Sequence, residues 1–349
     1  MLRLAALAHG RDNNFQLIRL LAATAVVLFH SYALTDHWTD EPLWQHMPEL
    51  NFGALGVACF FVISGFLVTQ SWLARERVVP FVAARALRIY PALAGAVALT
   101  LLLAWVSGAL PLSVFLTDPQ TLDYIVHVTL AWDIRHQLPG AFPGNPIPHD
   151  VNGSLWTLPV ELRLYVAVLV AGVFGLLARR AAWFAVLWLL LLWWLWRPEW
   201  LPPLPFNKVI GGLVLLFALG SLACVWRNAI PVSVAIAAVA LLLVIVNPGD
   251  LARGALFAPL LAYIVLVAAY HPRLVWPAFN RFGDYSYGVY VYSFPIQQTL
   301  VQRVPGIEPG PLFALAMALT LVVAALSWHF LEQPALGLKS RFGSPDRTP

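Results

Sequence analysis

Two ionisable side chains lie inside the first long apolar stretch of the sequence, where a membrane would make them costly. These are Arg19 and His30, in the stretch 15–34. At about 100° of rotation and about 1.5 Å of rise per residue, a helix would bring both onto one face, about 16 Å apart along its axis. Such residues usually mark function, and an imidazole could act as a general base or a nucleophile. An Arg that reaches the headgroups and a His bonded to a neighbouring helix would explain the pair equally well.

A second candidate site is the arginine pair Arg85 and Arg88. A spacing of three residues places both guanidinium groups on one face of a helix. Guanidinium groups suit bidentate phosphate binding better than lysine ammonium groups do. The pair therefore predicts a phosphate site, although charges that only set the membrane topology remain an alternative.

A carboxylate appears in the segment 152–165. Glu161 would lie about one and a half turns inside the membrane, and its expected partners are Arg163, a residue of the first helix or a substrate hydroxyl. Ser154 could instead serve as the N-cap of this helix. We expect Ser154, Trp156 and Tyr165 to contact a substrate.

Small residues recur in the stretch 52–72, among them Gly53, Gly56, Ser64 and Gly65. They permit close packing of helices, which is the commoner explanation, or they leave a slot for a thin ligand. We place Ser64 and Gly65 among the candidate donor-binding residues.

The composition indicates what surrounds these residues. Of the 349 residues, 60% are hydrophobic and only 11% are charged, whereas soluble domains have about 25% charged residues. The stretch 52–72 contains no Asp, Glu, Lys or Arg, and it is long enough to cross about 30 Å of hydrocarbon. The chain is therefore expected to be a multi-pass membrane protein.

Apolar runs between Pro, Gly and charged residues predict an all-α bundle of about ten transmembrane helices. They are expected near 15–34, 52–72, 89–112, 156–177, 181–197, 209–226, 230–246, 255–271, 285–302 and 312–331. The long connection 113–155 is rich in proline, and we expect it to form a partly re-entrant cap over the site.

The distribution of Lys and Arg predicts the orientation of this bundle. With a cytoplasmic N-terminus, fourteen of the 21 Lys and Arg residues fall on the cytoplasmic side, five on the other side and two within helices. This bias follows the positive-inside rule, and an even number of spans keeps both termini cytoplasmic. We expect a tail at 1–14, one transmembrane domain at 15–334 and a second tail at 335–349.

Other site classes have little support. The formal net charge is +4, but the basic residues are scattered between apolar segments, so topology explains them better than nucleic-acid binding does. The two cysteines, Cys59 and Cys224, show no metal-ligand spacing and imply no disulfide framework. We expect no metal and no permanently bound cofactor, and the oligomeric state is left open.

Taken in order, these motifs resemble the acyltransferase-3 family of bacterial membrane acyltransferases. The resemblance extends from about Asn14 to Pro334. It is carried by the following residues: Leu17–Ile18–Arg19 with His30, Gly56–Val57 with Phe60–Phe66, Arg85 and Arg88 with Pro91, Ser154–Thr157 with Glu161 and Tyr165, Ser286–Tyr287 with Tyr290, and Glu332 with Pro334. Two positions depart from the family pattern, because Gln16 replaces a common acidic residue and Ser293 replaces a common histidine.

The resemblance implies transfer of an acyl group, most often acetyl from acetyl-CoA, to a hydroxyl of a sugar or another extracytoplasmic acceptor. It implies an inner-membrane enzyme in which His30 and the arginine pair Arg85 and Arg88 matter most for activity. Any role of a second histidine is in doubt here because of Ser293.

Topology and family chemistry together suggest a mechanism. Arg85 and Arg88 would hold the CoA nucleotide, its narrow arm would pass between the first three helices, and Arg19 would line that path. His30 would act as the general base on a free or lipid-linked carbohydrate hydroxyl, or would itself be acylated. Glu161 or Tyr165 would orient His30 or the acceptor.

A transporter or flippase for a polar or lipid-linked glycan is the main alternative, because it would also need buried Arg, His and Glu along a path. The sequence shows no inverted repeat typical of transporters, which favours the acyltransferase. A scaffold without activity would not explain the intramembrane charges.

Overall fold

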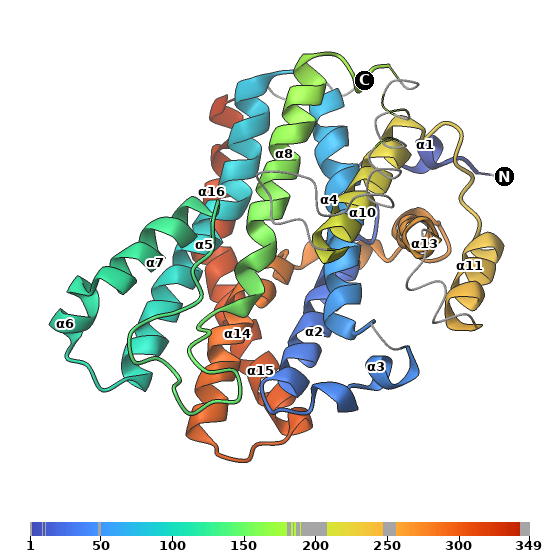
Figure 1. Cartoon of the computed structure of the whole chain (residues 1–349). Coiled ribbons are helices and arrows are strands. Elements are labelled where there is room, and N and C mark those ends of the chain that lie inside the picture. Colours follow the sequence, from blue (N-terminus) through green and yellow to red (C-terminus); the bar gives the residue numbers. More distant parts are fainter. Residues whose placement is uncertain are drawn as a thin grey trace.

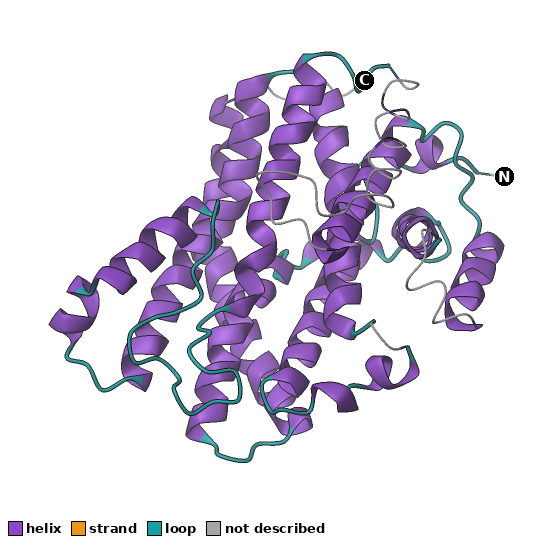
Figure 2. Cartoon of the chain, viewed as in Figure 1, coloured by secondary structure: helices purple, strands orange, loops and turns teal. Residues whose placement is uncertain are grey.

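The protein is described by a computed structural model that covers residues 2–8, 10, 12–47, 50–179, 208–246 and 256–342, with residues 183, 185 and 189 singly. Throughout these ranges the regular elements are helices, joined by loops (Figure 2). The one β-bridge among them joins Arg3 to Pro231 and belongs to no strand. The expectation of an all-α fold is confirmed.

Five helical stretches of the described chain are long and apolar enough to cross a membrane. They are α2 (Phe15–Ala33), α4 (Phe52–Leu73), α5 (Val78–Ser107), η2 with α8 (Gly153–Thr157 and Leu158–Val173), and α15 (Pro309–Ser327) with the helical turns that follow it. Shorter apolar helices are α10 (Lys208–Val225), α11 (Val234–Val246) and α13 (Phe257–Tyr270). The chain is therefore a multi-pass membrane protein.

The remaining elements are short or more polar. They are α1 (Leu4–Leu7), η1 (Trp38–Asp40), α3 (Pro42–His46), α6 (Leu112–Thr117), α7 (Pro119–Leu130), η3 (Pro277–Arg281), α14 (Ser286–Arg303), η4 (Trp328–Glu332), α16 (Gln333–Gly337) and η5 (Leu338–Phe342). Most of the expected helix at 181–197 lies outside the described residues. The total of ten spans, the three domain boundaries and the cytoplasmic placement of both termini stay predictions.

Two helices organise the packing of the others. Helix α4 packs on α2 and on α10, while α14 packs on α2, α5 and α15 (Figure 1). Glycines let α4 approach α2 and α10 closely. A Cβ on Gly56 would overlap the carbonyl oxygen of Ala22 in α2, and a Cβ on Gly65 would overlap the carbonyl oxygen of Phe217 in α10. Gly56 and Gly65 of α4 therefore serve helix packing.

Helix α5 begins at Val78, whereas the sequence predicted a start at residue 89. Pro91 therefore lies inside the helix rather than near its start. Residues 78–88 carry two charges, Arg85 and Arg88, which lowered the hydrophobicity of the segment, yet Ala, Leu and Arg are good helix formers. The earlier start places Arg85 and Arg88 two and three turns into α5, where they face neighbouring helices.

The long connection between α5 and η2 is attached to the polar half of α14. Pro295 has no N–H to donate to the carbonyl oxygen of Val291, one turn earlier in α14. The side-chain amide of Asn152 donates to this oxygen instead, at 2.9 Å. Gln298 donates to the carbonyl oxygens of Ile147 (2.9 Å) and Asp150 (2.7 Å), and Asn145 donates to Gln298. Whether this connection caps the site stays a prediction.

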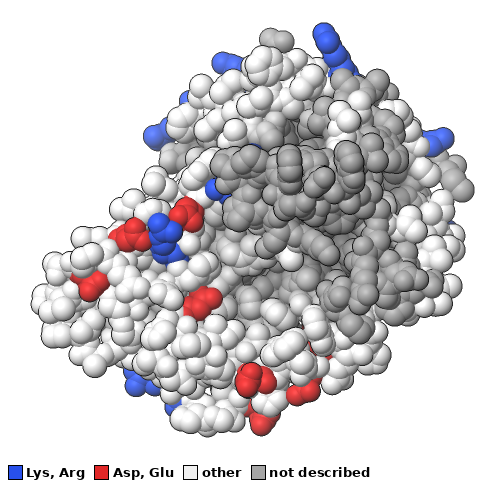
Figure 3. All heavy atoms as spheres, in the orientation of Figure 1, with Lys and Arg blue, Asp and Glu red and all other residues white. Residues whose placement is uncertain are grey.

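Charged side chains are unevenly spread over the visible surface. In Figure 3 basic side chains stand along the upper margin, whereas acidic ones lie along the lower margin and at mid-height on the left, and some basic ones accompany them in both places. The orientation of the bundle in the membrane stays a prediction.

The contact between α4 and α10 generates a test of the fold. Replacing Gly65 with Ala should lower the free energy of unfolding by about 1–3 kcal/mol, because the new methyl group overlaps the backbone of α10 at Phe217. Thermal unfolding of the detergent-solubilised protein would measure the loss. Gly310→Ala is the matched control, since a Cβ there meets nothing within 4 Å; equal stability of both variants would contradict the packing argument.

Candidate active site

Two cavities lie between the helices on either side of Tyr290. The inner cavity, of about 110 Å³, is lined by residues of α2, α4, α5, α8 and α14 and contains three arginines. The outer cavity, of about 730 Å³, is lined by α2, α4, η2, α10, α13 and α14 and contains His30. Among the described residues, Val57 and Tyr290 line both cavities.

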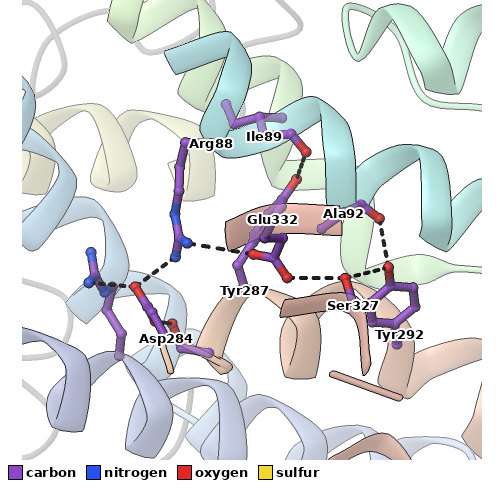
Figure 4. A network of polar contacts seen from close by, with 10 residues as sticks. Arg88, Ile89, Ala92, Asp284, Tyr287, Tyr292, Ser327 and Glu332 are labelled. Atoms are coloured by element: carbon purple, nitrogen blue, oxygen red, sulfur yellow. Dashed lines mark hydrogen bonds and ion pairs between the residues drawn. The ribbon is translucent and has the colours of Figure 1, made fainter. Parts of the chain in front are cut away.

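The charges of the inner cavity are organised around Asp284. Its Oδ2 accepts hydrogen bonds from Arg19 at 2.7 Å and from Arg88 at 2.8 Å, and its Oδ1 accepts one from Ser286 at 2.6 Å (Figure 4). Asp284 is 6% exposed. One carboxylate directly before α14 therefore joins α2 to α5, and in lipid each of these three charges depends on the others.

A second carboxylate approaches Arg88 from the end of α15. Glu332 is buried, its Oε2 lies 3.5 Å from Arg88 Nη1, and its Oε1 accepts a hydrogen bond from Ser327 at 3.1 Å. Glu332 ends η4, a single π-helical turn, and such turns are frequent at functional sites. Tyr292 of α14 donates to Ala92 and contacts Ser327, so α5, α14 and α15 are joined around Arg88 (Figure 4).

Arg85 differs from the other two arginines. Within the described chain it has no carboxylate partner: its Nη2 donates to Ser71 at 3.3 Å, and its guanidinium lies 5.8 Å from the ring centroids of Phe81 and Tyr165. Its Nε is buried and unpaired. Aromatic faces stabilise a cation and leave its donors available, so Arg85 can still bind an anion.

Glu161 lies in the inner cavity, held by two hydroxyl groups. Ser64 of α4 donates to its Oε1 at 2.8 Å, and Tyr165, one turn further along α8, donates to the same oxygen. The expected partner Arg163 points elsewhere: it donates to the carbonyl oxygen of Trp132 at 3.0 Å, and its guanidinium lies over the indole ring of Trp132. Tyr165 therefore connects Glu161 to Arg85.

His30 lines the outer cavity near the end of α2. Its ring packs edge-on against Phe294 of α14, with 5.0 Å between centroids. Its Nδ1 is buried and has no hydrogen-bond partner among the described residues. One turn beyond Phe294, Gln297 donates to Val27 (2.9 Å) and to Ser31 (2.8 Å), so α14 holds both the ring and the helical turn that carries it.

The short helix η2 runs from one cavity to the other. Ser154 and Trp156 line the outer cavity, and Thr157 lines the inner one. Between them, the hydroxyl of Tyr290 donates to the carbonyl oxygen of Ser154 at 2.6 Å and lies 2.7 Å from Thr157 Oγ1. A phenol has one proton, so Thr157 is the donor in the second hydrogen bond.

The ten residues singled out from the sequence thus divide into two groups. Those in the inner cavity are Arg19, Ser64, Arg85, Arg88, Glu161 and Tyr165. Those in the outer cavity are His30, Ser154 and Trp156. Gly65 lines neither cavity in the described chain and faces Phe217 of α10. Glu161, expected to orient His30 or the acceptor, lines a different cavity from His30.

Asp284, Glu332, Tyr290 and Gln297 had no expected role in the site. Tyr290 and Glu332 belong to the motifs that carry the family resemblance, so their presence could be noticed. Asp284 lies two positions before the Ser286–Tyr287 motif, where an acidic residue also suits the start of a helix. Gln297 had no such signal beyond an uncharged polar side chain within an expected span.

Comparisons with known proteins place the chain in a family. The family described as an acyltransferase domain (Acyl_transf_3) matches residues 12–329. Nodulation protein 10 of Rhizobium leguminosarum bv. viciae is 31% identical over 95% of both chains. The O-acetyl transferase of Shigella phage Sf6 is 29% identical over 93% of this chain and 96% of its own. No solved structure matches.

The family match covers most of the chain and includes all of the described residues that line the two cavities. It decides between the acyltransferase and the transporter considered from the sequence, in favour of the acyltransferase. The chain belongs to the acyltransferase-3 family and is a membrane O-acyltransferase.

Proposed function

We propose that this enzyme moves an acetyl group from cytoplasmic acetyl-CoA to a hydroxyl of a carbohydrate acceptor on the outer side of the inner membrane. The observation that carries the proposal is the pair of adjoining cavities, one with arginines and one with His30, that share Val57 and Tyr290. The O-acetyl transferase relative supports acetyl as the group transferred.

The inner cavity suits the donor. CoA is a phosphate-rich, narrow molecule, and Arg85 offers a buried guanidinium with unused donors. Arg88 and Arg19 are held by Asp284, so we assign them mainly to building the cavity wall. The thioester arm would extend from Arg85 past Ser64 and Thr157 towards the shared wall.

The outer cavity suits the acceptor. Its larger volume, the indole of Trp156, and the polar groups of Asn51 and Ser154 fit a sugar, whose faces stack on aromatic rings and whose hydroxyl groups bond to polar side chains. His30 would take the proton of the attacking hydroxyl. The hydroxyl oxygen bonds to the acyl carbon, the carbon–sulfur bond breaks, and His30 returns the proton to the leaving sulfur.

Replacing His30 with Ala should abolish acceptor modification, because no other described side chain offers an imidazole base to the outer cavity. A loss of about 10²–10⁴-fold is expected for a general base. The measurement is transfer of label from radiolabelled acetyl-CoA to envelope glycans isolated from cells that lack the enzyme. Retained activity in a stably folded variant would remove His30 from the mechanism.

The same experiment without acceptor separates the two roles of His30. A general base leaves the protein unlabelled after donor alone. Label that stays on the denatured wild-type protein and is absent from His30→Ala would instead indicate an acyl-histidine.

The two arginines of α5 should respond differently to substitution. Arg85→Ala should raise the KM for acetyl-CoA by about tenfold or more with little change in thermal stability, because one charge-assisted hydrogen bond is worth about 1.5–3 kcal/mol. Arg88→Ala should unfold at a lower temperature, because it leaves buried Glu332 without a cation and Asp284 with Arg19 alone. Steady-state kinetics and thermal unfolding of both variants provide the measurements.

A lysine variant supplies the matched control for Arg85. Arg85→Lys keeps the charge but loses the bidentate geometry, so it should recover KM only in part. Equal effects of Arg85→Ala and Arg88→Ala on both KM and stability would contradict the division of roles.

A further inference from the structure

The wall between the two cavities is thin and well defined. Val57 of α4 and Tyr290 of α14 line both sides of it, and Phe60 lines the inner side. The rings of Phe60 and Tyr290 meet at a centroid distance of 5.6 Å. Along any path from the arginines to His30 through this wall, an acyl group would have to pass these side chains.

The position of each wall residue is fixed by its neighbours. The Tyr290 hydroxyl is tied to Ser154 on the outer side and to Thr157 on the inner side. Val57 is held by the close approach of α4 to α2, where a Cβ on Gly56 would overlap the carbonyl oxygen of Ala22. A side chain between two tightly packed helices cannot move aside without disturbing the packing.

We infer that Val57, backed by Tyr290, sets the size of the acyl group that this enzyme transfers. The inference rests on the proposed division into a donor cavity and an acceptor cavity. A two-carbon acyl group needs little space beyond the thioester, whereas each further methylene must fit against the Val57 methyl groups. A misfit of one methylene in a hydrophobic pocket is worth about 10–200-fold in specificity.

Substitutions at Val57 should therefore shift chain-length preference in opposite directions. Val57→Ala removes two carbons from the wall, so the ratio of kcat/KM for acetyl-CoA to that for butyryl-CoA should fall at least about tenfold. Val57→Leu extends further into the passage, so it should lower propionyl transfer more than acetyl transfer and raise the ratio of kcat/KM for acetyl-CoA to that for propionyl-CoA. A residue with only a structural role would change all donors alike.

The experiment uses the full-length enzyme in lipid nanodiscs. The donors are acetyl-, propionyl- and butyryl-CoA with a radiolabelled acyl group, and the acceptor is envelope material from cells that lack the enzyme. Val62→Ala is the matched control, because Val62 is fully buried in the same helix, loses the same two carbons and lines neither cavity in the described chain. Its donor preference should equal that of the wild type.

The outcomes separate this inference from the proposed function. Wild-type transfer of acetyl together with a shifted preference in Val57→Ala supports both. Acetyl transfer by the wild type with an unchanged preference in both Val57 variants overturns the inference and leaves the proposed function intact. If the wild type transfers no acyl group from any of the three donors, the proposed function fails and the inference fails with it. If Val57→Ala does not fold, Val57→Leu decides alone: a raised ratio of acetyl to propionyl transfer supports the inference, and an unchanged ratio overturns it.

Discussion

The ion bridge at Asp284 is the interaction on which the arrangement of the site depends. Two arginines from different helices share one carboxylate oxygen, at 2.7 and 2.8 Å. Hydrocarbon cannot solvate separated charges, so each of these side chains is stable there only because the others are present. The bridge fixes α2 and α5 relative to the start of α14, and thereby places the arginine cavity at one end of the helix that carries His30.

The sequence predicted the fold class and most helices from hydrophobicity, because long apolar runs leave few alternatives in a membrane protein. Helices α2, α4, α10, α13 and α14 begin and end within a few residues of the expected positions. The start of α5 was predicted eleven residues late because charges near a helix end lower the hydrophobicity without weakening the helix. Pro91 reinforced that error.

The candidate site was predicted less completely. Nine of the ten chosen residues line one of the two cavities, since polar residues within a span have few other reasons to exist. Their pairing could not be predicted, because Asp284 and Arg19 are 265 positions apart in the chain. The sequence also left open whether Glu161 or Tyr165 orients His30 or the acceptor; in the structure Glu161 and Tyr165 line one cavity and His30 lines the other.

The polarity of α14 has a consequence for the biogenesis of the protein. Most of this helix, up to Gln298, is buried among its neighbours, and it is not among the stretches of the described chain apolar enough to cross a membrane unaided. Tyrosines and glutamines of α14 take hydrogen-bond partners from α2, α5 and the loop before η2. During insertion α14 must therefore leave the translocon into a bundle that already exists, not into lipid. The N-terminal helices provide the hydrogen-bond partners that lipid cannot offer to α14. The active site therefore forms only after α14 has packed against them.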